Sequence, residues 1–165
     1  MSPYLGKDSV DPFLSYPEKG VFLLCKTSNA GSGDLQDVLV LDEEERGKKK
    51  EGDLFPLSSF IPLHIRVAQL AQQWNTKNNI GLVVGATHVE ATKRVRAAAP
   101  DLWFLAPGVG AQGGELEAAL KAGLRKDGKG MLIPISRGIS RAEKPGLVAA
   151  EIRDQILDNK RHLNR

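Results

Sequence analysis

Residues 102–115 read LWFLAPGVGAQGGE, and they carry the clearest structural signal in the chain. The apolar run from Leu102 to Ala106 has the length and composition of a buried β-strand. It leads into Pro107 to Gly114, where four of the eight residues are glycine, and a helical pattern begins near Glu115. A strand that passes through a glycine-rich loop into a helix is typical of a parallel βα unit.

Three further apolar runs alternate with helical patterns in the same way. The runs are Val21 to Lys26, Gly81 to Gly85 and Gly130 to Ile135. The helices expected between the four runs are Ile61 to Asn75, Val89 to Ala99 and Glu115 to Leu124. This alternation predicts an α/β fold with about four complete parallel strands and flanking helices. Because the runs are continuous rather than alternating, we expect helices to cover both faces of the sheet.

Two regions depart from this alternation. Residues 41–57 form a charged insertion, in which four acidic residues precede four basic ones between Leu41 and Lys50. Charge blocks are usually hydrated, so a solvated loop is expected, with a partner-docking site as the alternative. The segment Glu151 to Arg165 is charged and has a helical period. It predicts a terminal amphipathic helix with an apolar side formed by Ile152, Ile156, Leu157 and Leu163.

The composition excludes several classes of protein. A chain of 165 residues suits one domain, and 23 Lys and Arg against 20 Asp and Glu give a net charge of only +3. This charge is too small and too dispersed to predict nucleic-acid binding. The single cysteine excludes an intramolecular disulfide. With neither a signal-peptide pattern nor an apolar run of about 18 residues, we expect a cytoplasmic protein without membrane contact.

The loops that follow the predicted strands are expected to carry the chemistry, because ligands bind at the carboxyl ends of parallel strands. The glycines between Pro107 and Gly114 let backbone N–H groups approach an anion, and the following helix adds a favourable dipole. Arg137 directly follows the last apolar run and can bind two phosphate oxygens in parallel. The two features predict a phosphate site on the last two strands. A ligand-free tight turn and a surface arginine are the alternatives.

The glycine-rich loop does not fit a dinucleotide site. Gly108 to Gly113 satisfies the Gly-x-Gly-x-x-Gly pattern. However, no acidic residue leaves a strand about 20 residues later, where Lys126 to Gly128 suggest a turn. The loop also lacks the Gly-Lys-Ser/Thr ending of a nucleotide-binding P-loop. A small phosphorylated ligand remains the expectation.

Other polar residues near strand ends allow more than one role. Ser28 and Asn29 can hydrogen-bond the edge of a polar heterocycle, and they serve equally well in turns and caps. For His88, the sequence places no carboxylate or serine partner nearby, which favours a loop histidine over an acid–base catalyst. Cys25 lies inside an apolar run and is expected to pack in the core. No metal site is expected.

Five segments occur in an order found in one enzyme family. They are Pro3 to Gly6, Lys26 to Asn29, Gly81 to Thr87, Pro107 to Gly114 and Pro134 to Arg137. Through them the chain resembles the orotidine 5'-phosphate decarboxylases, and most closely the bacterial-type subfamily that also occurs within some UMP synthases. The resemblance covers nearly the whole chain apart from the charged insertion. Its most specific motif is Pro-Gly-Val-Gly-Ala-Gln-Gly-Gly.

The resemblance implies a (β/α)8 barrel that converts orotidine 5'-monophosphate to UMP in pyrimidine biosynthesis, without a metal or an organic cofactor. It implies that Ser28 hydrogen-bonds the pyrimidine, that Gln112 reaches over the ligand to its phosphate and that Arg137 holds the phosphate. Backbone groups that would assist lie around Pro107, Gly110 and Ser136. The family is usually homodimeric, so a homodimer that acts on a small molecule is implied.

The catalytic motif of that family, Asp-x-Lys-x-x-Asp, does not occur in this sequence. Residue 1 falls where the family would be finishing its fourth strand. We therefore expect residues 1–165 to be the C-terminal half of the barrel, with no catalytic residue of its own and a need for the N-terminal half. The chain would supply the phosphate- and pyrimidine-binding half of the decarboxylase. The alternatives are a catalytically inactive nucleotide-binding half-barrel and another phosphate-handling barrel enzyme.

Overall fold

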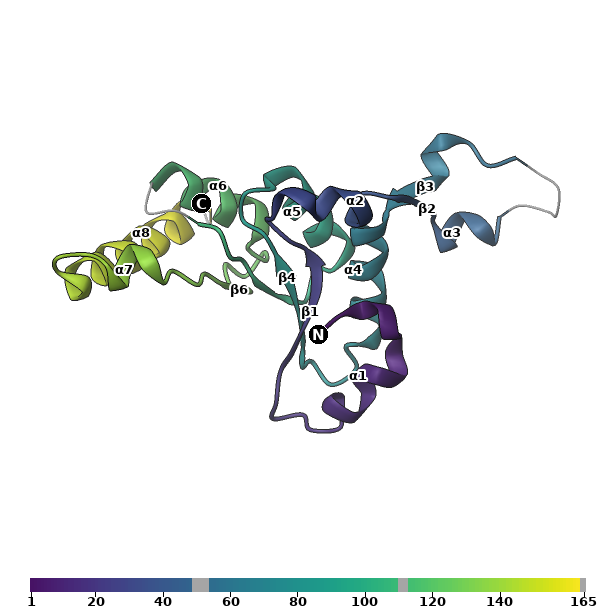
Figure 1. The fold of residues 1–165 in the computed structure, drawn as a ribbon, viewed down its shortest axis with the longest axis horizontal. Coiled ribbons are helices and arrows are strands. Elements are labelled where there is room, and N and C mark those ends of the chain that lie inside the picture. Colours follow the sequence, from purple (N-terminus) through teal and green to yellow (C-terminus); the bar gives the residue numbers. More distant parts are fainter. Residues whose placement is uncertain (49–53, 110–112, 164–165) are drawn as a thin grey trace.

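The computed structural model describes residues 1–48, 54–109 and 113–163. Figure 1 shows a central sheet with helices along it, α7 and α8 at one end and a separate hairpin at the other. The strands are β1 (Val21–Lys26), β2 (Leu39–Leu41), β3 (Phe60–Pro62), β4 (Ile80–Val84), β5 (Trp103–Leu105) and β6 (Met131–Leu132). The α-helices are α1 (Lys7–Leu14), α2 (Gly33–Gln36), α3 (Glu43–Arg46), α4 (Leu63–Trp74), α5 (Val89–Ala98), α6 (Gly113–Gly123), α7 (Arg137–Ser140) and α8 (Pro145–Leu163). Short 3-10 turns span Pro3–Leu5, Ala30–Ser32 and Leu57–Ser59.

Four strands form a parallel sheet in the order β1-β4-β5-β6. Leu24 of β1 lies beside Val83 of β4, which lies beside Leu105 of β5, and Leu105 lies beside Leu132 of β6. These are the four predicted apolar runs, so the prediction of a parallel α/β fold is confirmed. Because the strands are parallel, all four carboxyl ends meet at one edge of the sheet.

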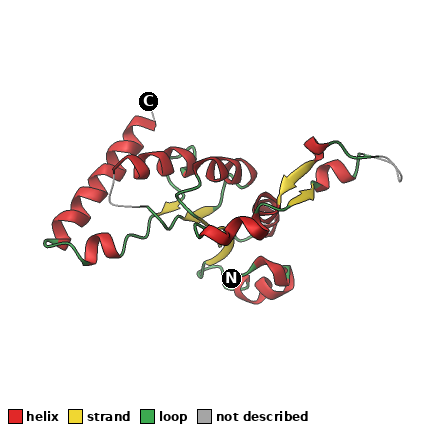
Figure 2. Ribbon diagram, turned by 45° about the horizontal axis from the view of Figure 1, so that its top comes forward, coloured by secondary structure: helices red, strands yellow, loops and turns green. Residues whose placement is uncertain are grey.

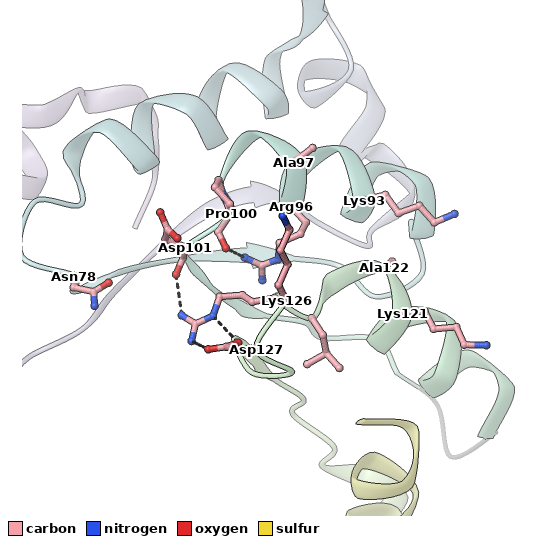
Figure 3. Close-up of a pocket in the computed structure, with 12 residues that line it drawn as sticks. Asn78, Lys93, Arg96, Ala97, Pro100, Asp101, Lys121, Ala122, Lys126 and Asp127 are labelled. Atoms are coloured by element: carbon pink, nitrogen blue, oxygen red, sulfur yellow. Dashed lines mark hydrogen bonds and ion pairs between the residues drawn. The ribbon is translucent and has the colours of Figure 1, made fainter. Parts of the chain in front are cut away.

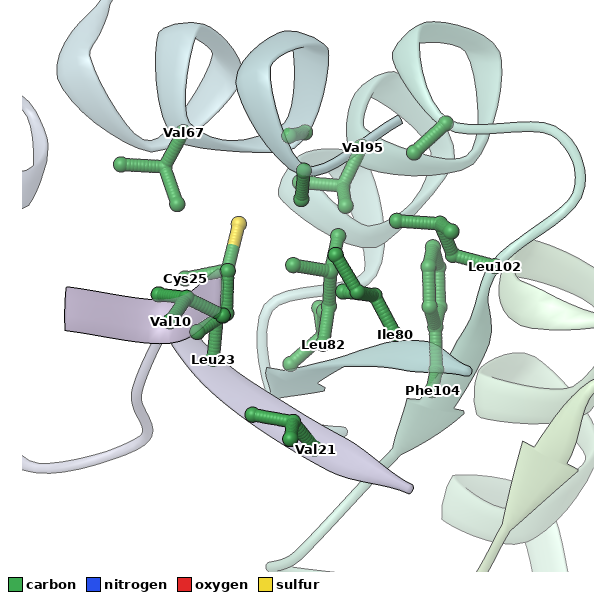
Figure 4. Packing of buried hydrophobic residues seen from close by; sticks show 14 of the residues in the cluster. Val10, Val21, Leu23, Cys25, Val67, Ile80, Leu82, Val95, Leu102 and Phe104 are labelled. Carbon is green, nitrogen blue, oxygen red and sulfur yellow. The ribbon is translucent and has the colours of Figure 1, made fainter. Parts of the chain in front are cut away.

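The main core lies between this sheet and the helices α4 and α5. Leu23, Leu82 and Phe104 occupy one face of the sheet, and each is 0% exposed. Val67 of α4 and Val95 of α5 pack over them, as Figure 4 shows. Burying large aliphatic and aromatic side chains in this way is the main force that holds the helices on the sheet.

The prediction that helices cover both faces of the sheet is wrong. Leu24 and Leu132 are each 44% exposed and Trp103 is 39% exposed, although all three lie within strands. Burial alternates from Val21 to Cys25 of β1, which is the pattern of a strand with one covered face. On the uncovered face the ring of Phe22 lies so close to Gly81 that a side chain at this glycine would collide with it. The continuous apolar runs therefore indicate a layer that covers the second face of the sheet, and the described residues do not supply this layer.

The charged insertion differs from the expected loop. β2 and β3 pair antiparallel and form a hairpin that stands apart from the four-stranded sheet (Figure 2). Asp42 then begins the short helix α3, since its side chain accepts a hydrogen bond from the Glu44 backbone N–H. Acidic residues occupy the first turn of α3 and Arg46 occupies the last, and both charges interact favourably with the helix dipole. The order of charges that suggested a hydrated loop thus also stabilises a helical turn.

The predicted helices lie close to their expected positions. α4 begins at Leu63 rather than Ile61, because the residues before it pair as β3. α8 begins at Pro145, six residues before the predicted start, and proline is well tolerated in the first turn of a helix. Ile152 and Ile156 pack against the core around α6, whereas Leu157 is 44% exposed. No helix in the described ranges is long and apolar enough to cross a membrane.

The one-sided core can be tested with two adjacent leucines. Leu23→Ala should lower the free energy of unfolding by about 2–5 kcal/mol, because it leaves a cavity in the core. Leu24→Ala should lower it by about 1 kcal/mol or less, because this side chain is already partly exposed. Urea unfolding of the two variants of the 165-residue chain measures both values. Equal losses would show that the second face is covered in this chain.

Candidate functional site

Three loops at the carboxyl edge of the sheet meet around Ser28. This residue follows β1 and is exposed. A Cβ atom at Gly85, after β4, would lie 2.9 Å from both the backbone nitrogen and the Cβ of Ser28. A Cβ atom at Gly108, after β5, would lie 3.6 Å from the Ser28 Oγ and 3.6 Å from Thr87. Glycine at position 85 therefore permits the close approach that gathers Ser28, Thr87 and Gly108.

The loop after β5 is held on both sides. The Ala86 N–H donates a hydrogen bond of 2.9 Å to the Pro107 carbonyl, which ties this loop to the one after β4. Val109 is buried and packs with Leu116 of α6. Gly108 has a φ of +94°, a conformation that glycine adopts without strain.

Two of the predicted binding residues in this loop, Gly110 and Gln112, lie outside the described residues. Their roles stay predictions. Pro107, the third, lies in the described part of the loop at the carboxyl edge.

Ser136 and Arg137 lie at the same edge, because they follow β6, the neighbour of β5. The Ser136 carbonyl accepts a hydrogen bond of 2.8 Å from the Ser140 N–H and so closes the single turn of α7. The Arg137 side chain is exposed. Within the described ranges, no hydrogen bond or ion pair joins Arg137 to Ser28, Thr87 or Gly108, so its place in a phosphate site stays a prediction.

A cavity of about 300 Å³ adjoins this group of loops. Its lining includes Thr87, Gly108 and Val109, with Glu115 and Ala118 from α6. Thr87 is exposed, and its Cγ2 methyl lies 3.6 Å from the position that a Cβ atom at Gly108 would take, but Thr87 was not among the predicted binding residues. Its position two residues after the apolar run Gly81 to Gly85 was the available signal.

A larger cavity, about 1010 Å³, lies at the opposite edge of the sheet (Figure 3). It is lined by the segments that precede β4, β5 and β6. Arg96 crosses its wall and donates hydrogen bonds to the carbonyls of Leu102, Gly123 and Gly130, at 2.7, 2.9 and 3.2 Å. Its guanidinium also lies 3.6 Å from the centre of the Phe104 ring. These contacts stabilise the fold, and in parallel barrels chemistry is found at the other edge.

Burial lowers the pKa of Arg96 to about 10, which still leaves it protonated near neutral pH. It can therefore keep all of these hydrogen bonds under ordinary conditions.

A cluster of charged and polar side chains lies behind the Ser28 loop. Lys26 is 3% exposed, and its Nζ donates to both carboxylate oxygens of Asp37 at 2.8 Å. This hydrogen bond lowers the pKa of Asp37. His64 Nδ1 lies 3.2 Å from Asp37 and 2.8 Å from the Gln36 carbonyl. Burial lowers the pKa of His64, because it removes water from the charged imidazolium.

Cys25 and His88 occupy the structural positions that the sequence suggested. Cys25 is 2% exposed and its Sγ donates to the His64 carbonyl at 3.1 Å. Burial raises its pKa to about 12, so the thiol stays protonated and the prediction of core packing is confirmed. His88 precedes α5, where its carbonyl accepts a hydrogen bond from the Thr92 N–H. The described residues contain no cluster of three or more His, Cys, Asp or Glu side chains that is arranged to hold a metal ion.

The parallel sheet with its flanking helices defines a class of protein: half of a parallel β/α barrel, a fold in which ligands bind in the loops after the strands. A sequence profile described as "Orotidine 5'-phosphate decarboxylase / HUMPS family" matches residues 1–152, and the chain belongs to this family. The resemblance found in the sequence motifs is confirmed.

Relatives with this name are similar along nearly the whole chain. The orotidine 5'-phosphate decarboxylase of Roseiflexus castenholzii is 44% identical over 154 residues, which cover 93% of this chain and 50% of that protein. The enzyme of Azoarcus sp. is 44% identical over 165 residues, which cover 99% of this chain and 54% of that protein. The chain thus spans about half the length of the curated relatives that it matches.

Solved structures give the same answer for the fold. The OMP decarboxylase of Leishmania donovani superposes with a TM-score of 0.79 at 47% identity, over 96% of this chain and 55% of that one. The UMP synthase of Leishmania donovani superposes with the same TM-score at 50% identity, over 96% of this chain and 32% of that one. The predicted half of a (β/α)8 barrel is confirmed.

The buried imidazole makes stability depend on pH. The pKa of His64 is lower in the folded chain than in the unfolded chain, where it is near 6.5. The unfolded chain therefore binds more protons as the pH falls below about 6.5, and the free energy of unfolding should fall between about pH 7 and pH 5. The lowered pKa of Asp37 adds a further loss only as the pH falls below about 4.

His64→Gln should flatten the dependence of stability on pH between about pH 7 and pH 5. Urea unfolding at three pH values in this range measures the slope for both proteins. A slope that is unchanged in His64→Gln would assign the dependence to other groups.

Proposed function

We propose that this chain supplies the substrate-binding half of an orotidine 5'-phosphate decarboxylase, which converts orotidine 5'-monophosphate to UMP and carbon dioxide. The observation that carries the proposal is the meeting of Ser28, Thr87 and Gly108 at the carboxyl edge of a half-barrel that belongs to this family. Ligands of parallel barrels bind at this edge.

Each proposed binding residue has a role in nucleotide binding that its functional group can fill. The Ser28 hydroxyl can donate to or accept from the polar edge of the pyrimidine. The Arg137 guanidinium can form two parallel hydrogen bonds to the phosphate, and Gln112 can reach the same group. Backbone groups at Pro107, Gly110 and Ser136 complete the cradle. Holding the phosphate and the base at two points orients the carbon that loses carbon dioxide.

The chemical step needs groups that this chain does not carry. When the C6–carboxylate bond breaks, its electron pair stays on C6, and a nearby ammonium must stabilise this charge and then deliver a proton. The Asp-x-Lys-x-x-Asp motif that serves this purpose in the family is absent from residues 1–165. We infer that the lysine and the aspartates belong to the N-terminal half of the barrel.

The uncovered face of the sheet supports this partner. The row of Leu24, Val83, Leu105 and Leu132 runs across all four strands and is partly or largely exposed. Such a row is typical of the interior of a barrel, where side chains from the opposite strands fill the centre. We further propose a homodimer of complete barrels that acts in the cytoplasm.

Co-expression tests the proposal. The chain should form a stable complex with the N-terminal half of the Roseiflexus castenholzii relative, and the complex should release carbon dioxide from orotidine 5'-monophosphate. In this complex Arg137→Ala should raise KM, and the Kd for UMP, by about 10- to 100-fold, the effect of losing a charged hydrogen bond.

Arg141→Ala is the matched control, because Arg141 is also exposed and lies at the other end of α7. It should leave both constants nearly unchanged. An assembled complex without decarboxylase activity would contradict the proposal. If the isolated chain were a folded monomer that bound UMP with micromolar affinity, the inactive nucleotide-binding half-barrel would be the better explanation.

A further inference from the structure

Thr27, the residue before Ser28, is held by a side chain from another element. β1 ends at Lys26, so the Thr27 N–H lies beyond the last residue of the strand. The Gln36 Oε1, at the end of α2, accepts a hydrogen bond from this N–H at 2.9 Å. The Gln36 Nε2 donates to the Thr27 Oγ1, also at 2.9 Å. One amide thus holds both the backbone and the side chain of Thr27.

Gln36 is itself anchored to buried groups. The backbone carbonyl of Gln36 lies 2.8 Å from His64 Nδ1. Because a carbonyl can only accept a hydrogen bond, the imidazole carries a proton on Nδ1. His64 is 3% exposed in the first turn of α4. The next residue, Asp37, is bound through both carboxylate oxygens by the buried Lys26. The short helix α2 is therefore fixed to β1 and to α4 at the point where Gln36 lies.

This arrangement confines Ser28 on two sides. On one side Thr27 is held by Gln36, and the Thr27 hydroxyl donates a hydrogen bond of 2.6 Å to the Asn29 side chain. On the other side lies Gly85, and a Cβ atom at this position would come within 2.9 Å of the Ser28 backbone nitrogen, so only glycine leaves room there. The Ser28 hydroxyl makes no hydrogen bond to another described residue, so it remains available to a ligand while its backbone is held.

We propose that Gln36 is a positioning residue for Ser28: through its two hydrogen bonds to Thr27 it aims the Ser28 hydroxyl at the pyrimidine edge of the bound nucleotide. The inference rests on the proposed function, since it concerns the same site. Gln36 does not touch the nucleotide, and its effect on binding passes through Ser28.

A cycle of substitutions in the assembled complex tests the proposal, with UMP as the probe. Gln36→Ala should raise the Kd for UMP by about 3- to 10-fold, the effect of weakening one hydrogen bond. In a Ser28→Ala background the same substitution should change the Kd by less than about 2-fold, because the aimed hydroxyl is already gone. A merely structural role of Gln36 would weaken binding equally in both backgrounds.

Gln72→Ala is the control for general damage. The Gln72 side chain also makes a two-bond contact, donating to the Asp101 carboxylate at 3.1 Å and accepting from the Asp101 N–H at 3.4 Å. This contact lies at the opposite edge of the sheet, so the Kd for UMP should stay unchanged.

Thr27 supplies a second, milder test in case Gln36→Ala does not fold. Thr27→Val removes the hydroxyl that binds Gln36 and Asn29, keeps the backbone hydrogen bond to Gln36, and should raise the Kd for UMP by about 2- to 5-fold. Thr27→Ser keeps the hydroxyl and should restore the parental value. UMP binding that is unaffected by both Gln36→Ala and Thr27→Val would overturn the inference. A parental complex that binds no UMP would instead overturn the proposed function.

Discussion

The parallel pairing of β1, β4, β5 and β6 is the constraint on which the rest of this structure depends. Parallel strands place all their carboxyl ends at one edge, so loops that are far apart in the sequence become neighbours. The register sets Leu24, Val83, Leu105 and Leu132 in one row across the sheet. The same pairing allows Gly85, at the end of β4, to lie directly against Ser28, at the end of β1. A shift of one residue would turn every strand side chain to the opposite face.

The stabilising contacts of Arg96 and the proposed ligand-binding residues lie at opposite edges of this sheet. At the amino edge, Arg96 joins α5 to the segments around β5 and β6 through carbonyl hydrogen bonds and the Phe104 ring. At the carboxyl edge, Ser28 and Thr87 are exposed, and the hydrogen bonds there hold backbone in place. Arg96 is therefore a structural arginine, and the large cavity beside it is separate from the candidate site.

The uncovered sheet face links the fold to the proposed chemistry. This chain, which spans about half the length of its relatives, contains the strands proposed to bind phosphate together with the helices that pack on them. It also leaves a layer of apolar side chains exposed, as Trp103 and Leu132 show. The groups that act on C6 of the pyrimidine and the side chains that would fill the barrel centre both belong, by this proposal, to the N-terminal half of the barrel. The covering of this sheet face and catalysis would then depend on the same partner.

The sequence alone determined the four strands of the parallel sheet and the family, because apolar runs and glycine-rich loops are local patterns. It also placed Ser28 and Pro107 at strand ends and Cys25 in the core. Only the tertiary structure decided which sheet face is covered, since a continuous apolar run looks the same whether its second partner layer is present or not. The hairpin of β2 and β3 was missed because its two short strands are separated by the charged insertion. Gln36 and Thr87 were missed as well, because their importance arises from contacts across loops that only parallel strand pairing brings together.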